Sequence, residues 1–192
     1  MAKLSVYLKN HGHGCLVTIG DILQPIAAGL AEAGHSIQYE NHFLYNRPII
    51  NLLVEYFVDT AFVDDLIEKK RTLGSDFALG VLVTEDVGDP LVMDLSSFPG
   101  RLANLRRVLE VADFVWSLVP AEVYAGIVPD PARLAFLRLG YVHALAEKRR
   151  AGGQDIDVLV YGQPVPRRDA IMAEISRRGW NVRSTFGVMP DY

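Results

Sequence analysis

The chain has 192 residues, half of them hydrophobic and 22% charged, so it is large and apolar enough to bury a sizeable core. The formal net charge of −4, with no long basic run, argues against nucleic-acid binding through a stripe of phosphate-neutralising side chains. Cys15 is the single cysteine, which excludes an internal disulfide and a cysteine-rich zinc site.

Targeting signals are not evident in the sequence. The first residues run directly into a strand pattern and show no signal peptide. The most apolar window, residues 48–58, is interrupted by Asn51 and Glu55 and is too short to cross a bilayer. We therefore expect a cytoplasmic protein without a membrane span.

Apolar strand-like runs alternate with helical periodicities along most of the chain. Alternating strands and helices indicate right-handed crossovers, and therefore an α/β fold with a Rossmann-like, doubly wound and mainly parallel sheet. The pattern predicts strands over residues 3–8, 36–39, 77–84, 113–119 and 133–139, and helices over residues 22–33, 48–58, 60–73, 101–112 and 121–126.

Local signals mark where several of these helices begin and end. Asp21 and Gln24 have the spacing of a capping box, and Pro25 indicates a kink or a late start of the first helix. Gly34 stands where a glycine commonly ends a helix, and Thr60 is a candidate N-cap.

Two apolar runs are interpreted differently. Residues 48–58 are apolar on nearly every side, which is typical of a buried helix. Residues 77–84 form a continuous apolar run, which is typical of a parallel strand covered on both faces.

The sequence predicts two parts joined by a linker. Residues 147–154 are polar and contain two glycines, so they are the candidate linker. Residues 1–146 then form a Rossmann-like domain. Residues 155–192 restart the pattern with a strand, a helix over residues 166–178 and a second strand.

The loop after the first predicted strand carries two histidines between two glycines. Glycines let the backbone approach a ligand, and either His11 or His13 is a candidate general base at this edge. Gly12 and Gly14 are the candidate binding glycines. A dinucleotide-binding fingerprint is disfavoured because Val17 occupies the position of its third glycine. The alternative is a tight turn with two solvated histidines.

Two charged pairs complete the candidate site. Glu85 and Asp86 follow the buried strand over residues 77–84, at the edge where ligands bind in such sheets. They are candidates to orient a histidine or to bind sugar hydroxyls, and an ordinary polar loop is the alternative. Arg167 and Arg168 begin a predicted helix, where a bound phosphate would offset their unfavourable interaction with the helix dipole. Side chains that point into water are the alternative.

Two stretches resemble the GT-B fold glycosyltransferases. Residues 23–37, with Gly34 and His35, look like the first helix and the Gly-His turn of that family. Residues 155–162, followed by Arg167 and Arg168 and then by residues 186–188, resemble the segment that opens the second domain in family-1-like bacterial members.

The resemblance implies an acceptor-side first domain and the first βαβ unit of a donor domain. It implies a nucleotide-sugar donor and an acceptor hydroxyl, with either inversion or retention at the sugar. In inverting members a histidine in the loop after the first strand is the base, which corresponds to His11 or His13, and Glu85 or Asp86 would be its acidic partner. No cofactor or metal is expected. Because most of the donor domain is not found, we expect no sugar transfer by the chain alone. The alternative function is a non-catalytic Rossmann-like binding or assembly module.

Overall fold

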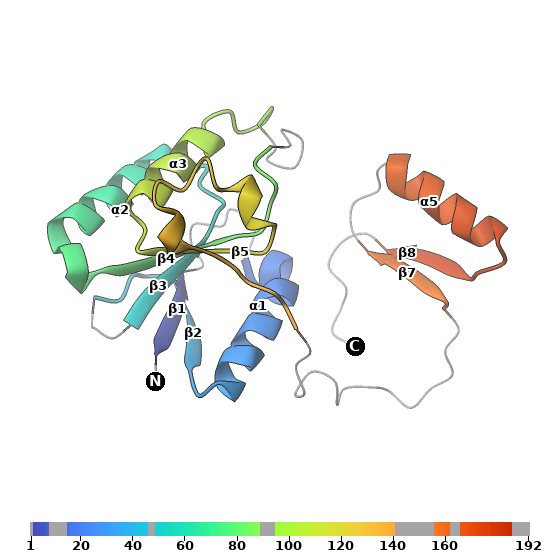
Figure 1. Cartoon of the computed structure of the whole chain (residues 1–192), viewed down its shortest axis with the longest axis horizontal. Helices are drawn as coiled ribbons and strands as arrows, with labels where there is room; N and C mark the ends of the chain where they lie inside the picture. The colour runs from blue at the N-terminus through green and yellow to red at the C-terminus, as the bar shows by residue number, and fades with distance from the viewer. Residues whose placement is uncertain are drawn as a thin grey trace. The chain divides into compact units, whose positions relative to one another are not determined.

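The computed structural model describes residues 2–7, 15–45, 49–88, 95–140, 156–161 and 166–185. The chain divides into two compact units, Met1–Ala146 and Glu147–Tyr192. Each unit contains its own parallel strands (Figure 1).

The first unit contains a six-stranded sheet in which every pair of neighbours is parallel. Its strands are β1 (Lys3–Tyr7), β2 (Ser36–Glu40), β3 (Ile49–Val54), β4 (Ala78–Val83), β5 (Phe114–Ser117) and β6 (Leu134–Phe136). The spatial order is β2-β1-β3-β4-β5-β6. The chain therefore builds the sheet first on one side of β1 and then on the other, with the change of direction between β1 and β3. This arrangement confirms the predicted parallel α/β, Rossmann-like sheet.

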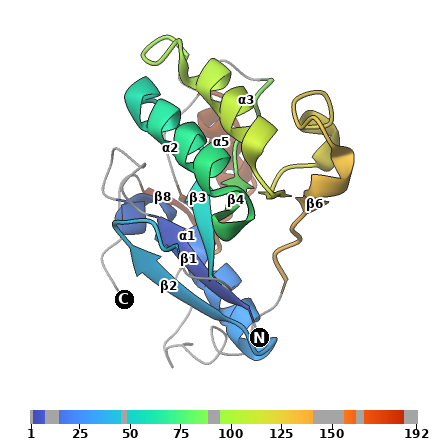
Figure 2. The same ribbon diagram turned by 90° about the vertical axis from the view of Figure 1, so that its left-hand side faces the viewer.

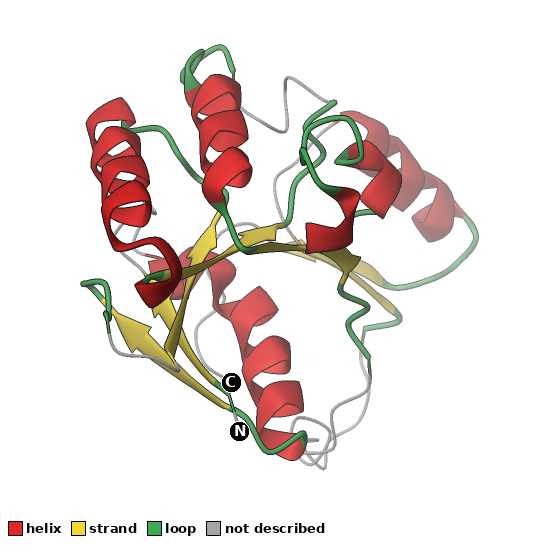
Figure 3. Cartoon of the chain, turned by 60° about the vertical axis from the view of Figure 1, so that its left-hand side comes forward, coloured by secondary structure: helices red, strands yellow, loops and turns green. Residues whose placement is uncertain are grey.

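Helices cover both faces of this sheet, as Figure 3 shows. Helix α1 (Cys15–Glu32) packs on one face of the sheet. Helices α2 (Thr60–Leu73) and α3 (Arg101–Val111) pack on the other face. Leu52 and Leu82 belong to the apolar cluster on the α1 side, whereas Leu53 and Val81 belong to the cluster on the side of α2 and α3. Adjacent residues of β3 and β4 thus bury their side chains on opposite faces, as expected for central parallel strands.

Short 3₁₀ helices complete the first unit. They are η1 (Gly74–Asp76), η2 (Ala121–Val123) and η3 (Pro131–Arg133). The helix expected over residues 121–126 is therefore only the turn η2. The strand expected over residues 133–139 is shortened to β6.

The prediction of a buried helix over residues 48–58 is wrong, because this stretch contains β3. A short run that is apolar throughout cannot be assigned to a helix or to a doubly covered strand by periodicity alone. Asn51 does not interrupt the strand, because its side chain is used inside the protein. Its Oδ1 accepts from the Leu44 amide at 2.9 Å, and its Nδ2 donates to the carbonyls of Leu44 at 2.8 Å and Ala78 at 3.3 Å.

The ends of α1 and α2 differ in part from the expectations. Helix α1 begins at Cys15, so the capping box predicted at Asp21 is not at the helix start, and Pro25 lies inside the helix. Gly34 has a φ of 77° after α1, which confirms its predicted role in ending the helix. Asp59, not Thr60, is the N-cap of α2, and its carboxylate accepts from the amides of Ala61 and Phe62.

The second unit is a single βαβ arrangement. It consists of β7 (Val158–Tyr161), α5 (Pro166–Arg177) and β8 (Val182–Thr185), and its two strands are parallel. The helix is close to the range expected from the sequence. None of the described residues of this unit is buried, and Trp180 is 56% exposed.

The ring of Phe114 leaves no room for a side chain at Gly80 in β4. A Cβ atom placed there would lie 2.2 Å from the ring of Phe114, its partner on β5. We expect Gly80→Ala to lower the free energy of unfolding by about 1–3 kcal/mol, measured by urea denaturation.

Two further variants control this prediction. Gly29→Ala in α1 meets no atom within 4 Å and should raise stability by about 0.5–1 kcal/mol through helix propensity. Phe114→Leu should reduce the cost of Gly80→Ala. Equal stability of Gly80→Ala and the wild type would contradict the packing argument.

Candidate functional site

The ends of β3 and β4 bring two polar residues together at the carboxyl edge of the sheet. Glu55 directly follows β3, and its amide donates to the Leu82 carbonyl of β4 at 3.1 Å. Thr84 directly follows β4. Ligands bind at this edge in open parallel sheets, next to the strand where the order reverses direction, and β3 is one of the two strands at that point.

Glu55 is a carboxylic acid enclosed by protein. It is 1% exposed, and its Oε1 accepts from the Thr84 amide at 2.9 Å and from the Thr84 hydroxyl at 2.5 Å. Its Oε2 is also buried and has no hydrogen-bond partner among the residues that the structure describes. Burial raises the pKa of Glu55 to about 7, against the hydrogen bonds from Thr84, and the nearby Glu85 carboxylate raises it further. Glu55 therefore gains or loses its proton near neutral pH.

Glu85 is held by two other segments of the first unit. Its Oε2 accepts from Nη2 of Arg101 at 2.5 Å, and Arg101, at the start of α3, is almost fully buried. The guanidinium carbon of Arg101 lies 4.4 Å from the ring centroid of Tyr56. The Tyr124 hydroxyl donates to the Glu85 carbonyl at 2.7 Å. These two contacts hold the turn after β4 in place, so Glu85 has a structural role.

Asp86 makes a local contact within the same turn. Its Oδ1 accepts from the Gly88 amide at 2.8 Å, which is the geometry of an Asx turn. The Asp86 side chain is exposed. The sequence prediction thus placed Glu85 and Asp86 correctly after a buried strand, but the deeply buried acid of this edge is Glu55.

His11, Gly12, His13 and Gly14 lie outside the described residues, so their assignment as base and binding glycines stays a prediction. Strand β1, which precedes these residues, ends at Tyr7 and is the direct neighbour of β3 in the sheet.

The predicted phosphate site lies in the second unit. Arg167 and Arg168 are in the first turn of α5, and both are exposed. The structure therefore does not bring them together with Glu85 and Asp86 in one compact unit.

Two further residues of the first unit have structural roles. Tyr124 is fully buried. His35 lies at the junction between α1 and β2, where its Nδ1 accepts from the Ala2 amide at 3.1 Å.

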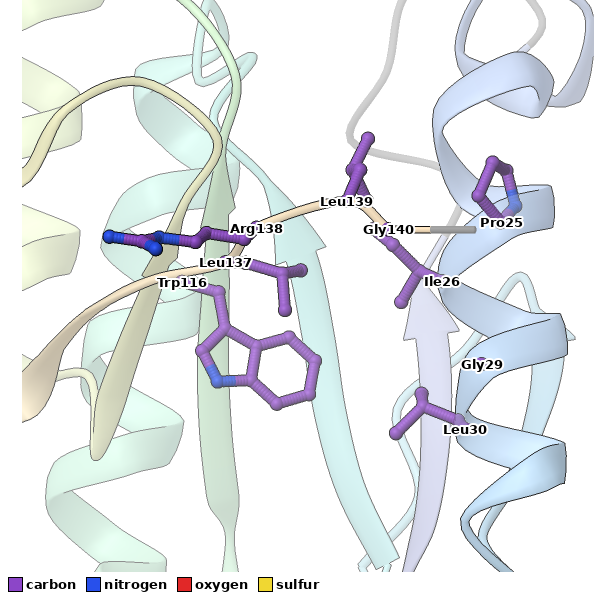
Figure 4. A pocket seen from close by; sticks show the side chains of 9 residues that line it. All are labelled: Pro25, Ile26, Gly29, Leu30, Trp116, Leu137, Arg138, Leu139 and Gly140. Carbon is purple, nitrogen blue, oxygen red and sulfur yellow. The ribbon is translucent and has the colours of Figure 1, made fainter. Parts of the chain in front are cut away.

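Trp116 forms one wall of a cavity of about 240 Å³ (Figure 4). The indole faces α1, whose residues Ile26 and Leu30 form the opposite wall, and Leu137 and Leu139 contribute further apolar surface. Among the described residues that line it, Arg138 is the single ionisable one, and its guanidinium points away from α1. The described lining is therefore mostly apolar, and it includes neither Glu85 nor Asp86.

Sequence reasoning missed Glu55 and Arg101. A detectable signal was present for Glu55, because it is a single acid within the apolar run over residues 49–58. Because that run was interpreted as a helix, the position of Glu55 directly after a central strand was not recognised. Polar residues at this edge of a parallel sheet are candidates for ligand binding. Arg101 carries no such signal, because arginine is ordinary at the surface of a helix.

The described ranges contain no group of three or more His, Cys, Asp or Glu side chains able to hold a metal ion. No helix in these ranges combines the length and apolar character needed to cross a membrane.

Comparison with known proteins does not identify a family. The sequence matches no protein-family model, and it matches no curated protein.

The buried acid predicts a specific dependence of stability on pH. Glu55 keeps its proton in the folded state up to about pH 7, whereas in the unfolded chain it ionises near its ordinary value of 4.5. Between these two values the unfolded state loses the proton first, so the free energy of unfolding falls as pH rises. We expect this contribution to fall by about 3 kcal/mol from pH 4.5 to pH 8, in urea denaturation measured across this range.

Two variants isolate the effect of Glu55. Glu55→Gln should remove this component, so that its stability relative to the wild type rises with pH. Asp86→Asn, which removes an exposed carboxylate from the neighbouring turn, should keep the wild-type dependence. Wild-type and Glu55→Gln curves that run parallel would show that Glu55 ionises normally in the folded protein.

Proposed function

We propose that the first unit binds a sugar acceptor at the carboxyl edge of its sheet, as the acceptor side of a GT-B-type glycosyltransferase. The observation that carries this proposal is the position of Glu55, a buried acid at the end of β3, beside the point where the strand order reverses. An acid that exchanges its proton near neutrality at this edge suits a site where a hydroxyl group is deprotonated.

In the proposed reaction, a base removes the proton of the acceptor hydroxyl. The acceptor oxygen then forms a bond to the anomeric carbon of a nucleotide sugar, and the bond from that carbon to the diphosphate breaks. The nucleoside diphosphate leaves with the bonding electrons. The resemblance assigns the base to His11 or His13, and Glu85 is held by Arg101 close to the same edge.

The donor side of the proposal depends on Arg167 and Arg168. Both precede most of α5, so a diphosphate bound there would contact two guanidinium groups and the amides of a helix start. Arg177, at the other end of α5, is paired with Glu174 at 2.9 Å and serves as a matched control.

We expect the double variant Arg167→Ala, Arg168→Ala to bind uridine diphosphate about tenfold more weakly or worse, as measured by isothermal titration calorimetry on the whole chain. Arg177→Ala should bind it as the wild type does. Equal affinity of all three proteins would remove these arginines from the proposed donor site.

The acceptor side is tested separately by NMR. Monosaccharides and nucleotide sugars are added to the labelled chain, and amide shift changes are mapped. Changes at Glu55 and Thr84, but not at Lys3 and Ala78 on the opposite edge of the sheet, are the expected result. Changes confined to the amino edge, or no sugar binding at all, would contradict the proposal.

A non-catalytic binding or assembly module is the second candidate function. It is favoured by the second unit, whose described residues include no buried side chain and several exposed apolar ones, among them Ile171 and Trp180 on or next to α5. A small βαβ unit with this much exposed apolar surface suits a surface that meets other protein. Concentration-dependent self-association without sugar binding would favour this function.

A further inference from the structure

The Glu55 side chain joins the end of β3 to the turn after β4. Both of its hydrogen bonds from Thr84 converge on the single oxygen Oε1. The next residue, Glu85, is held by Arg101 through its side chain and by Tyr124 through its carbonyl. The first residue of the turn over residues 84–88 is therefore hydrogen-bonded to the end of β3 through a titratable group.

The surroundings of Glu55 favour its neutral form. The titratable groups that interact with it are Glu85 from the turn and Tyr124 from the segment after η2, and Tyr124 in turn interacts with Arg101 of α3 and with Asp86. The charge that acts on Glu55 is the Glu85 carboxylate, which carries the same sign. Arg101 is already engaged with Glu85. An ionised Glu55 would thus be a buried anion that faces a second anion.

The second carboxyl oxygen increases that cost. Oε2 is buried and has no donor among the described residues, so a negative charge on Glu55 would be stabilised on one oxygen only. Rotation of the side chain towards water is the simplest relief, and it would take Oε1 away from the amide and hydroxyl of Thr84.

We propose that the proton on Glu55 controls the turn over residues 84–88 as a switch. With the proton bound, the carboxyl group stays inside the sheet edge and ties Thr84 to β3. When the proton is lost, the side chain leaves this position, the tie is broken and the turn opens at the edge of the sheet. This device is independent of which ligand binds at that edge, and it would make access to the edge greater above neutral pH than below it.

Amide hydrogen exchange tests the switch without any ligand. We expect the protection of the Thr84 amide, corrected for intrinsic exchange, to fall by about 30-fold between pH 5.5 and pH 8.5, since pH 8.5 is about 1.5 units above the pKa of Glu55. In Glu55→Gln, which cannot ionise, the protection of Thr84 should stay constant over the same range.

The same strand provides an internal control. The Leu79 amide of β4 donates to Oδ2 of Asp113 at 2.7 Å, and that carboxylate is half exposed and paired with Lys70. It is therefore also an amide bound to a carboxylate, but to one that is half exposed and paired with a lysine. Its protection should not change between pH 5.5 and pH 8.5 in either protein.

A direct titration covers the case in which Glu55→Gln does not fold. The Glu55 carboxyl carbon of the wild type is followed by ¹³C NMR, and its midpoint should coincide with the midpoint of the loss of Thr84 protection. A midpoint near the ordinary value for glutamate would overturn the switch. Constant Thr84 protection, or an equal loss at Leu79 and Thr84, would overturn it as well.

Discussion

Burial of β3 and β4 on both faces is the constraint on which the rest of the first unit depends. Apolar clusters lie on each side of these strands, so polar groups among or next to them must find partners within the protein. Asn51 does so through the backbone of Leu44 and Ala78. Asn104 of α3 does so by donating to the Phe57 carbonyl and the Thr60 hydroxyl, each at 3.1 Å.

Glu55 is less completely paired than these two asparagines. Asn51 and Asn104 lie below the strand ends and satisfy their polar atoms with backbone or side-chain partners. Glu55 lies at the strand end itself, and one of its oxygens has no partner among the described residues. A buried polar atom of this kind costs stability, and such costs are typical of positions kept for function. The α2 and α3 layer, shown side by side in Figure 2, supplies the arginine that stabilises the adjoining turn.

The sequence allowed the sheet to be predicted better than the site. Continuous apolar character identified β4 because its length and its flanking turn residues fit a strand. The same character misled for β3, because a run that is apolar on nearly every side fits a buried helix as well as a doubly covered strand. Asn51 and Glu55 are in fact enclosed at the sheet. Thr84, which donates hydrogen bonds to Glu55, and Glu85, which raises its pKa, lie about 30 positions further along the sequence. A local sequence pattern cannot predict such a contact. The buried ion pair of Arg101 is hidden for the same physical reason: the sequence records a charge but not its environment.

The order of the strands also bears on how the chain acquires its structure during synthesis. From β4 to β6, each strand pairs with the strand that precedes it in the sequence, so each of these strands can add to an edge that already exists. Strand β1 differs, because both of its neighbours, β2 and β3, follow it in the sequence. Pairing between strands that are consecutive in the sequence keeps the loops that must be closed shorter than pairing between distant strands would. Since domains generally fold as units while the ribosome delivers the chain from its N-terminus, the six-stranded sheet can be complete before β7 and α5 have been translated.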